Sequence, residues 1–421
     1  MAGREEIEKR QLDGLRSLLG ELEGSENRFY GERMVAAGVS GALGSVGEFI
    51  AAMPFTTKDE LLCDREAEAP FGSNLTYPLS EYTRYCQSSG TTGGAVPSID
   101  TTESWGALLD CWDVVYDAAG VGKEDVVFFA FSFGPFLGFW TAFDGAARRG
   151  CLCIPGGGLS SVGRLETMRA QGATVLCCTP TYAMRLGEVM QGEMGALPEE
   201  FGVKTIIVAG EPGGSIEESR ERVSSLWGGV RVVDHHGMTE VGPVSYEPVN
   251  RPLSLKVIEE AHLAEVIDLE SGEEVAPGES GELVLTTLKR WACPLLRYRT
   301  GDLVRKAYDD DGGLLLDGGI LGRVDDMVVV RGVNVYPTAI ERVVRRFDEI
   351  AEYRVVQSEV DSMTELKIEI EPMEALTDGA DLADRVQAAM QDAFALRVPV
   401  ETVMPDTLPR FEFKAKRWIK Q

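Results

Sequence analysis

Short apolar runs alternate with helical segments between about residues 120 and 240, and this alternation constrains the fold more than any other feature. The apolar runs lie at 126–131, 151–155, 174–180, 205–212 and 230–237. They are nearly continuous in apolar and β-branched residues, which is typical of strands covered on both faces. Helical stretches between such strands indicate parallel crossovers. We therefore predict an α/β domain built on a mainly parallel sheet.

The pattern changes after this region. Residues 253–322 contain strand-like runs separated by turn clusters, which indicates antiparallel β structure. Residues 323–421 alternate again and predict a small α+β lobe with its own core. A chain of 421 residues is long enough for two such units. We therefore predict a large domain over residues 1–322 and a C-terminal lobe over 323–421, joined at the GRVDD segment that begins at Gly322.

The chain is strongly acidic. It has 41 lysine and arginine residues against 68 aspartate and glutamate residues, so its formal net charge is −27. Binding to nucleic acid or to anionic lipid requires a basic surface, so we expect neither nucleic acid nor a membrane as a partner. A phosphate ligand must be met by local dipoles and a few well-placed cations.

Other features favour a reducing cytoplasm. The 8 cysteines form no CxxC pair. Four of them lie in the apolar runs at 151–155 and 174–180, where buried free thiols are expected. The charged, helical N-terminus is not a secretory signal. Residues 126–143 carry no charge, but Gly134 and Pro135 interrupt them, so we predict a strand, a loop and the start of a packed helix rather than a membrane span.

A loop rich in hydroxyl groups and glycine occupies residues 87–94. It reads Gln87, Ser88, Ser89, Gly90, Thr91, Thr92, Gly93 and Gly94. The backbone N–H and side-chain O–H groups of such a loop can surround an anion, and glycine permits the close approach that this requires. The segment is not a GxxxxGK[ST] phosphate loop. Taken alone, such a loop is more often a flexible connection.

Further polar motifs follow in order along the chain. The first, DHHGMTE at 234–240, follows an apolar run, at the end of a strand where open α/β sheets bind ligands. The others are LRYRTGDL at 296–303, GRVDD at 322–326 and FKAKR at 413–417. Together with the loop at 87–94, these motifs resemble the core motifs of the adenylate-forming superfamily, which includes acyl-CoA synthetases, nonribosomal adenylation domains and luciferases.

Finer details resemble one branch of that superfamily. The segments TPTYA at 179–183, AGEP at 209–212, CPLLRYRTGDL at 293–303 and GRVDDMVVVRGVNVYPTAIE at 322–341 look most like phenylacetate–CoA ligases. The resemblance implies an enzyme that joins a carboxylate to ATP, releases pyrophosphate, and then rotates its C-terminal lobe so that a thiol displaces AMP. It also implies ATP/AMP, Mg²⁺ and coenzyme A as ligands, and a homodimer.

The resemblance assigns nucleotide contacts to residues of these motifs. The phosphates would be held by Ser88, Ser89, Gly90, Thr91, Thr92 and Gly93. The adenine would be contacted by Gly210, Glu211, Pro212, His235, His236, Gly237 and Met238. Asp302 would accept hydrogen bonds from the ribose hydroxyl groups, since a carboxylate suits two neighbouring O–H donors. Arg323 would lie beside the ribose and the phosphate.

The resemblance implies catalytic roles for other residues. Thr239 would contact the α-phosphate, and Glu240 would help to hold Mg²⁺. Lys414 would bring its ammonium group to the reacting carboxylate and the α-phosphate, where negative charge develops. Asp325 would be the hinge.

Each of these side chains also has a structural explanation. Asp302 could cap a turn, Arg323 could pair with Asp325 or Asp326, and Lys414 could be a solvated lysine of the tail. The ordered set of motifs favours the functional interpretation.

The sequence departs from the family pattern in three places. Gly94 stands where the phosphate loop usually has a lysine, which removes one phosphate contact. His236 replaces an aromatic residue that stacks on adenine, although an imidazole can also stack or donate a hydrogen bond. His262 matches the histidine of a zinc site found in many relatives, but the accompanying cysteines are absent. One histidine without thiolates is a weak ligand set, so we predict no structural zinc.

An aromatic loop predicts the acyl pocket. By resemblance, the pocket would be lined by Phe131, Phe133, Gly134, Phe136 and Tyr182, and such walls suit an aryl or arylacetic acid. Plain core packing is the alternative for each ring. We therefore expect an AMP-forming aryl-CoA ligase. Two alternatives stay open: an adenylating enzyme with another acceptor (a carrier protein, an amine or a deazaflavin phenol), and a degenerate member that binds nucleotide without catalysis.

Overall fold

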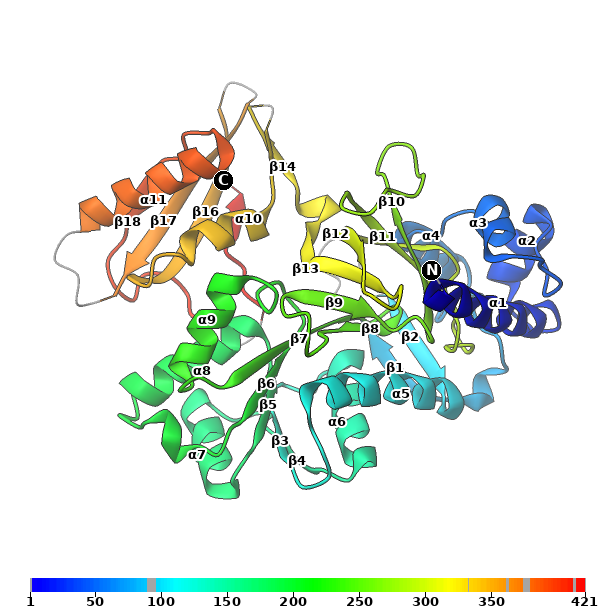
Figure 1. The fold of residues 1–421 in the computed structure, drawn as a ribbon, viewed down its shortest axis with the longest axis horizontal. Coiled ribbons are helices and arrows are strands. Elements are labelled where there is room, and N and C mark those ends of the chain that lie inside the picture. The colour runs from blue at the N-terminus through cyan, green and yellow to red at the C-terminus, as the bar shows by residue number, and fades with distance from the viewer. Residues whose placement is uncertain are drawn as a thin grey trace.

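The computed structural model of the protein describes residues 2–88, 96–331, 333–360, 363–373, 379–411 and 414–420. Its N-terminal segment, blue in Figure 1, forms the helices α1 (Ala2–Glu23), α2 (Arg28–Ala37), α3 (Val46–Ala52) and α4 (Lys58–Ala67). The apolar faces of α1, α2 and α3 pack together on Leu263, Leu288 and Leu296 from the body of the protein. This segment therefore rests on the large domain rather than forming a separate core.

The alternating region forms a parallel sheet, as predicted. Its strands are β3 (Val126–Phe129), β4 (Leu152–Pro155), β5 (Val175–Cys178), β6 (Thr205–Val208) and β7 (Arg231–Met238). They are separated by α6 (Leu137–Arg149), α7 (Ser161–Gln171), α8 (Pro180–Gly192), the short 3₁₀ helix η2 (Pro198–Glu200) and α9 (Glu217–Leu226). Neighbouring strands pair in the order β4-β3-β5-β6-β7, all of them parallel. The uncharged stretch 126–143 is thus a strand, a loop and a helix start.

Helices cover both faces of this sheet because successive strand residues point to opposite sides. Val127 and Phe129 belong to the core formed with α5 (Thr102–Ala119) and α6. Phe128, between them, belongs to the core formed with α7, α8 and α9. Figure 1 shows the two helix layers on either side of the strands. Burial on both faces accounts for the near-continuous apolar runs in the sequence.

The antiparallel region continues the same sheet. After β7 come β8 (Gly242–Tyr246), β9 (Ser254–Val257), β10 (His262–Ile267), β11 (Ser280–Thr287), β12 (Tyr298–Tyr308) and β13 (Leu314–Arg323). Over the described residues the full sheet has 11 strands in the order β10-β11-β12-β13-β9-β8-β7-β6-β5-β3-β4. We predicted separate parallel and antiparallel parts. They merge at β7, which pairs in parallel with β6 up to Asp234 and antiparallel with β8 from His235 onward.

A hairpin lies beside this sheet. The 3₁₀ helix η1 (Leu79–Glu81) leads into β1 (Tyr82–Gln87), which pairs antiparallel with β2 (Pro97–Thr101). The predicted phosphate loop at 87–94 begins at the end of β1 and lies between the two strands in the sequence. Only its first residues, Gln87 and Ser88, belong to the described part of the chain.

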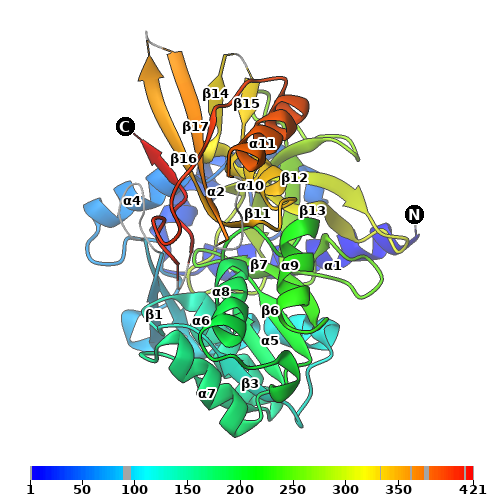
Figure 2. The same cartoon turned by 90° about the vertical axis from the view of Figure 1, so that its left-hand side faces the viewer.

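The C-terminal lobe has its own sheet and core. It begins with the 3₁₀ helix η3 (Val324–Asp326) and the hairpin β14 (Val328–Val330) and β15 (Val333–Val335). The lobe continues with α10 (Pro337–Val344), β16 (Ile350–Val360), β17 (Met363–Pro372), α11 (Gly379–Phe394), β18 (Val400–Thr402) and β19 (Trp418–Lys420). Its strands pair in the order β18-β17-β16-β19. In both Figure 1 and Figure 2 the lobe lies over α8 and α9 of the large domain. None of the described helices is long and apolar enough to cross a membrane.

Candidate active site

Asp302 lies at the centre of a buried polar cluster. Its Oδ2 atom is 3.0 Å from Nε2 of His236 and its Oδ1 atom is 3.2 Å from Nη1 of Arg323. Asp302 and Arg323 are directly opposite each other on β12 and β13, and His236 comes from β7. Because the carboxylate accepts, Nε2 of His236 carries the proton. The paired strands therefore bring three distant motifs of the sequence to one point.

The guanidinium group of Arg323 is held by several acceptors. Nη1 also donates to the carbonyl oxygen of Thr300 at 3.2 Å, and Nε donates to Asp325 at 2.9 Å. Burial opposes the charge of Arg323, but the carboxylates of Asp302 and Asp325 outweigh it and raise its pKa. Gly301 has a φ of +75°, and a Cβ atom there would lie 2.7 Å from Nη2 of Arg323. Glycine at this position thus makes room for the arginine.

The other residues of the DHHGMTE motif differ in their surroundings. His235 is fully enclosed: its Nδ1 atom lies 2.7 Å from the carbonyl oxygen of Ser245, and its ring is 4.6 Å from that of Trp112. Burial lowers the pKa of His235 to about 4, so the ring is neutral. Gly237 and Met238 pair with β8. His235 thus packs in the interior, whereas His236 reaches Asp302.

Arg290 positions Thr239 and Glu240, and sequence reasoning missed it. Nη1 of Arg290 donates to the carbonyl oxygens of Thr239 at 3.0 Å and Glu240 at 2.8 Å. The guanidinium group is buried and forms a two-pronged pair with Asp100, with N–O distances of 2.8 and 2.6 Å. Burial opposes this charge, but Asp100 raises the pKa of Arg290 above its usual value. A single buried arginine between two motifs has no recognisable spacing signal.

The carboxylate of Glu240 borders an open cavity. Lys58, at the start of α4, brings its Nζ atom to 3.8 Å from Oε1 of Glu240. The cavity is open to solvent and is lined by residues that include Arg65, Asn74, Ser98 and Glu240. The hairpin that carries the predicted phosphate loop therefore lies beside this carboxylate.

The described part of the phosphate loop ends at Ser88. This residue is buried, and its backbone N–H donates to Val96 at 3.0 Å while its Oγ atom accepts from the N–H of Val96 at 2.9 Å. These bonds close the base of the loop. The predicted contacts of Ser89, Gly90, Thr91, Thr92 and Gly93, and the substitution at Gly94, lie outside the described residues.

The AGEP segment, which follows β6, contacts the C-terminal tail. Gly210 has a φ of +92°, and a Cβ atom there would lie 3.6 Å from Cε of Lys414. Glu211 accepts from the N–H of Thr181 at 3.0 Å and from the N–H of Ala415 at 2.8 Å. Pro212 is exposed beside them. The predicted adenine pocket and the predicted catalytic lysine are thus neighbours, although they come from different lobes.

Lys414 lies in a negative environment. Desolvation lowers the pKa of its ammonium group below the usual value, while the carboxylates of Glu211, Asp302 and Glu240 oppose this shift. The residue is nevertheless exposed to solvent. The lysine therefore belongs to the same electrostatic cluster as the residues of the large domain.

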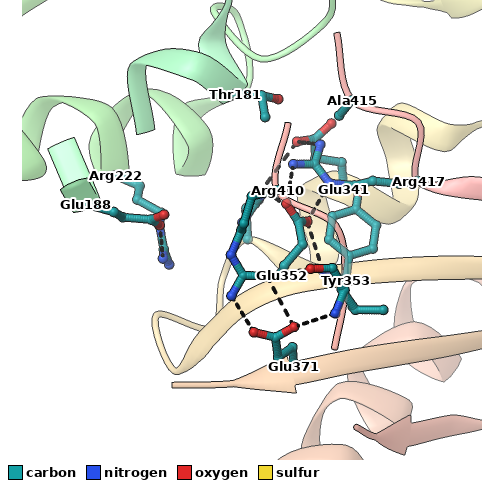
Figure 3. A network of polar contacts seen from close by, with 12 residues as sticks. Thr181, Glu188, Arg222, Glu341, Glu352, Tyr353, Glu371, Arg410, Ala415 and Arg417 are labelled. Atoms are coloured by element: carbon teal, nitrogen blue, oxygen red, sulfur yellow. Dashed lines mark hydrogen bonds and ion pairs between the residues drawn. The ribbon is translucent and has the colours of Figure 1, made fainter. Parts of the chain in front are cut away.

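A buried ion pair anchors the tail that carries Lys414. Arg417 donates to Glu352 through Nε at 2.7 Å and Nη2 at 3.2 Å, and its Nη1 atom lies 3.5 Å from Glu341. Its guanidinium carbon is 5.0 Å from the centre of the Tyr353 ring. Figure 3 shows this network within the C-terminal lobe. Burial opposes the charge, but the neighbouring glutamates raise the pKa of Arg417.

Comparison with known proteins decides the family. A family profile described as "AMP-binding enzyme" matches residues 84–288, and one described as "AMP-binding enzyme C-terminal domain" matches residues 332–421. The phenylacetate-coenzyme A ligase of Thermus thermophilus is 32% identical over 383 residues, which cover 86% of this chain and 84% of that protein. The chain belongs to the AMP-binding enzyme family. It is an adenylate-forming, phenylacetate–CoA ligase-like enzyme, whose family uses ATP and coenzyme A as substrates.

Solved structures identify the arrangement of the two lobes. A 2-hydroxyisobutyryl-CoA ligase in the postadenylation state, in complex with 2-HIB-AMP, has a TM-score of 0.93 with 26% identity, covering 99% of this chain and 90% of that chain. The same ligase with 2-HIB-AMP and CoA in the thioesterification state has a TM-score of only 0.73, at 27% identity and the same coverage. This AMP-binding enzyme therefore resembles the postadenylation arrangement.

The predicted acyl-pocket residues form part of a larger aromatic cluster. The rings of Phe131 and Phe139 stack with centroids 4.2 Å apart, and Phe133 contacts Trp140 at 5.1 Å. Trp140 donates to the carbonyl oxygen of Gly134 at 3.0 Å. Phe133 has a φ of +48°, which is strained for a non-glycine residue. Phe136, at the start of α6, contacts Phe139 at 5.7 Å.

Tyr182 has different surroundings. Its side chain is buried in the core between α7 and α8, its hydroxyl lies 3.1 Å from Oγ of Ser161, and the Cζ atom of Arg164 lies 4.8 Å from its ring centre. Its place in an acyl pocket stays a prediction.

His262 is also buried. Its Nδ1 atom lies 3.4 Å from the carbonyl oxygen of Ile258, and burial lowers its pKa to about 4. Among the described residues no three His, Cys, Asp or Glu side chains gather as a metal site. Glu247, in the region where the resemblance would place one zinc-site cysteine, pairs with Arg220. The absence of zinc stays a prediction, which elemental analysis of the purified protein tests.

Proposed function

We propose that this ligase activates an aromatic or arylacetic carboxylic acid as its acyl-adenylate and transfers the acyl group to coenzyme A. The aromatic cluster around Phe131, Phe133 and Phe139 supports this class of acid, because ring contacts stabilise an aryl group by dispersion and offset stacking. The relative from Thermus thermophilus, named as a phenylacetate-coenzyme A ligase, points to the same class.

The observation that carries the proposal is the cluster of Asp302, His236 and Arg323 beside Lys414. In our proposal the carboxylate of Asp302 gives up some of its present hydrogen bonds and accepts hydrogen bonds from the two ribose hydroxyl groups instead. His236 then lies against the adenine. Gly210, Glu211 and Pro212 line the other side of the base. The cluster then fixes the nucleotide so that its α-phosphate lies near Thr239.

Lys414 is proposed as the group that stabilises the adenylation transition state. As the acid's carboxylate attacks the α-phosphate, negative charge accumulates on the phosphate oxygens. A positioned ammonium group in a partly desolvated site stabilises this charge strongly. Desolvation lowers the pKa of Lys414. The negative charge of the bound nucleotide raises this pKa again, so the ammonium group stays protonated.

The surroundings of Glu240 fit Mg²⁺. Mg²⁺ is usually held by one or two carboxylates together with substrate phosphates and water, and the Glu240 carboxylate borders an open cavity beside the hairpin of the phosphate loop. When bound, the ion neutralises charge on the polyphosphate. Arg290 keeps the backbone of Thr239 and Glu240 in place.

We further propose that the lobes 1–322 and 323–421 rotate against each other about Asp325. Strand β13 ends at Arg323 and the 3₁₀ helix η3 contains Asp325, so the proposed hinge lies where the large sheet ends. The rotation would carry Lys414 away and admit the thiol of coenzyme A.

A panel of acids tests the substrate proposal. Pyrophosphate release would be measured with phenylacetate, benzoate, hexanoate and 2-hydroxyisobutyrate, and acyl-CoA formation would be followed by mass spectrometry after adding coenzyme A. We expect the arylacetic or aryl acid to have the highest kcat/KM. A preference for an aliphatic acid would contradict the proposed pocket. Pyrophosphate release without acyl-CoA would indicate another acceptor, and no release with any acid would favour the degenerate, non-catalytic alternative.

A further inference from the structure

The carboxylate of Glu211 connects the two lobes through backbone groups. Its Oε1 atom accepts from the N–H of Thr181, at the start of α8, at 3.0 Å. Its Oε2 atom accepts from the N–H of Ala415, in the C-terminal tail, at 2.8 Å. Figure 3 shows Thr181 and Ala415 close together where the lobes meet. Each oxygen of one carboxylate therefore serves a different lobe.

Only an ionised carboxylate can accept both hydrogen bonds well. A glutamine side chain has one acceptor oxygen, and its NH₂ group would face the other N–H donor. Burial raises the pKa of Glu211, while the N–H of Ala415, the side-chain hydroxyl of Thr181 and the charge of Arg417 oppose this shift. The bonds from two backbone donors thus offset part of the desolvation of the charge.

The residue before Ala415 is Lys414, so the hydrogen bond to Glu211 acts one peptide away from the proposed catalytic lysine. The stem of Lys414 lies over Gly210, the neighbour of Glu211. Within its own lobe, the tail is fixed by the pair of Arg417 with Glu352 and by β19 on β16. These contacts lie inside one lobe, whereas the bond from Ala415 to Glu211 crosses between lobes.

We propose that Glu211 is a positioning residue that holds Lys414 at the nucleotide in the adenylation arrangement and releases it when the C-terminal lobe turns. This inference rests on the proposed role of Lys414. It goes beyond the adenine contact expected of the AGEP segment. Because the bond from Ala415 to Glu211 joins the lobes, it must break on rotation, so this bond contributes to the first half-reaction and not to the second.

The test compares the two half-reactions in three variants. Adenylation is measured as pyrophosphate release with an acid that the wild type accepts, and thioester formation is measured from supplied acyl-adenylate and coenzyme A. For Glu211→Ala we expect adenylation to fall by about 10- to 100-fold, as for the loss of hydrogen bonds to a charged acceptor, and by at least about fivefold more than thioester formation, in which only the adenine contact of Glu211 is lost. Glu211→Gln keeps one acceptor oxygen, so we expect its adenylation rate to fall by less than that of Glu211→Ala.

Glu218→Ala is the matched control. Glu218 on α9 lies 3.3 Å from Arg346 of the C-terminal lobe, so it also contributes an ion pair across the lobe boundary, but it does not touch the tail. We expect both half-reactions of Glu218→Ala to stay within about twofold of wild type, as is usual for an ion pair that is partly exposed to solvent. If Glu218→Ala lost adenylation as strongly as Glu211→Ala, general lobe docking would explain both, and the proposal would be wrong.

A double variant tests whether Glu211 acts through Lys414. In Lys414→Ala the side chain to be positioned is gone, so adding Glu211→Ala should reduce adenylation by less than about threefold further. The proposal would be overturned if the loss of adenylation in the double variant equalled the product of the two single losses. It would also be overturned if Glu211→Ala lost both half-reactions equally. Failure of the substrate proposal would be separately visible, because the wild type would then release no pyrophosphate with aromatic acids.

Discussion

The carboxylate of Asp302 and the guanidinium group of Arg323 face each other across β12 and β13, with Oδ1 and Nη1 3.2 Å apart. The two residues are 21 positions apart in the sequence, and strand pairing brings them into register. Asp302 also accepts a hydrogen bond from Nε2–H of His236. One carboxylate therefore positions both side chains of the proposed ribose site.

Asp302→Ala should therefore weaken nucleotide binding. The change removes the proposed acceptor of the ribose hydroxyl groups and one of the two carboxylates that pair with Arg323. We expect KM for ATP to rise by about 10- to 100-fold, since hydrogen bonds to a charged group contribute roughly 1.5–3 kcal/mol. Asp317→Ala, at a half-exposed carboxylate of β13, is the control and should leave KM unchanged. An unchanged KM in Asp302→Ala would contradict the ribose assignment.

Arg290→Met should destabilise the large domain. It leaves the carboxylate of Asp100 buried without its partner, and such losses cost about 3–5 kcal/mol in the free energy of unfolding. Urea unfolding measures this, with Arg305→Met as the control, because Arg305 pairs with Asp317 at the surface at 3.7 Å and its loss should cost about 1 kcal/mol or less. Equal stability losses in the two variants would contradict a stabilising, buried Arg290–Asp100 pair.

Buried neutral histidines predict a loss of stability in mild acid. Burial lowers the pKa of His262 from 6.5 to about 4, so the unfolded chain binds a proton between these pH values that the folded chain does not. Stability therefore falls as pH decreases through this window, by about 2 kcal/mol per such histidine between pH 7 and pH 5. His235 behaves in the same way, whereas Asp234, whose pKa is raised to about 6, partly offsets the loss.

The variant His262→Gln isolates this effect. It removes one titrating ring, so the change in unfolding free energy between pH 7 and pH 5 should be smaller than in wild type by about 2 kcal/mol. An identical change in both proteins would show that His262 does not titrate as its burial requires.

Much of the fold follows from local patterns in the sequence. The runs at 126–131 and 174–180 are apolar on both strand faces because helices cover both faces of the parallel sheet, which makes such strands visible without a structure. The merging of the two sheet regions was not predictable. It depends on β7 changing partner at His235, and nothing in the order of residues there distinguishes a strand end from a continuation.

Site residues could be predicted from the sequence only where they belong to a motif of consecutive residues. The ordered motifs indicated Asp302, Arg323 and Lys414, and the structure brings them into one electrostatic cluster. Arg290 was missed because its partners, Asp100 and the carbonyl oxygens of Thr239 and Glu240, are distant in sequence and two of them are backbone atoms. The bond of Glu211 to Ala415 was missed for the same reason.

Asp325→Pro should slow the second half-reaction selectively. Proline fixes φ and would stiffen η3, so the lobe could no longer reach the arrangement for thioester formation. We expect pyrophosphate release to stay within about threefold of wild type, while acyl-CoA formation from supplied adenylate falls by at least about tenfold. Asp325→Ala, which removes the contact with Arg323 but leaves the backbone free, should retain both activities. Equal losses of the two half-reactions in Asp325→Pro would contradict a hinge at this residue.

The most direct test of the central claim is the adenylation rate of Lys414→Ala measured beside that of Lys416→Ala. Lys416 is an exposed cation of the same tail, two residues away, and provides the matched control. The account predicts that Lys414→Ala loses about 10²- to 10³-fold in pyrophosphate release, the usual cost of one positioned group at a developing charge. It should retain thioester formation from supplied acyl-adenylate, and Lys416→Ala should match wild type in both steps. Normal pyrophosphate release by Lys414→Ala, or equal losses in the two lysine variants, would contradict the account.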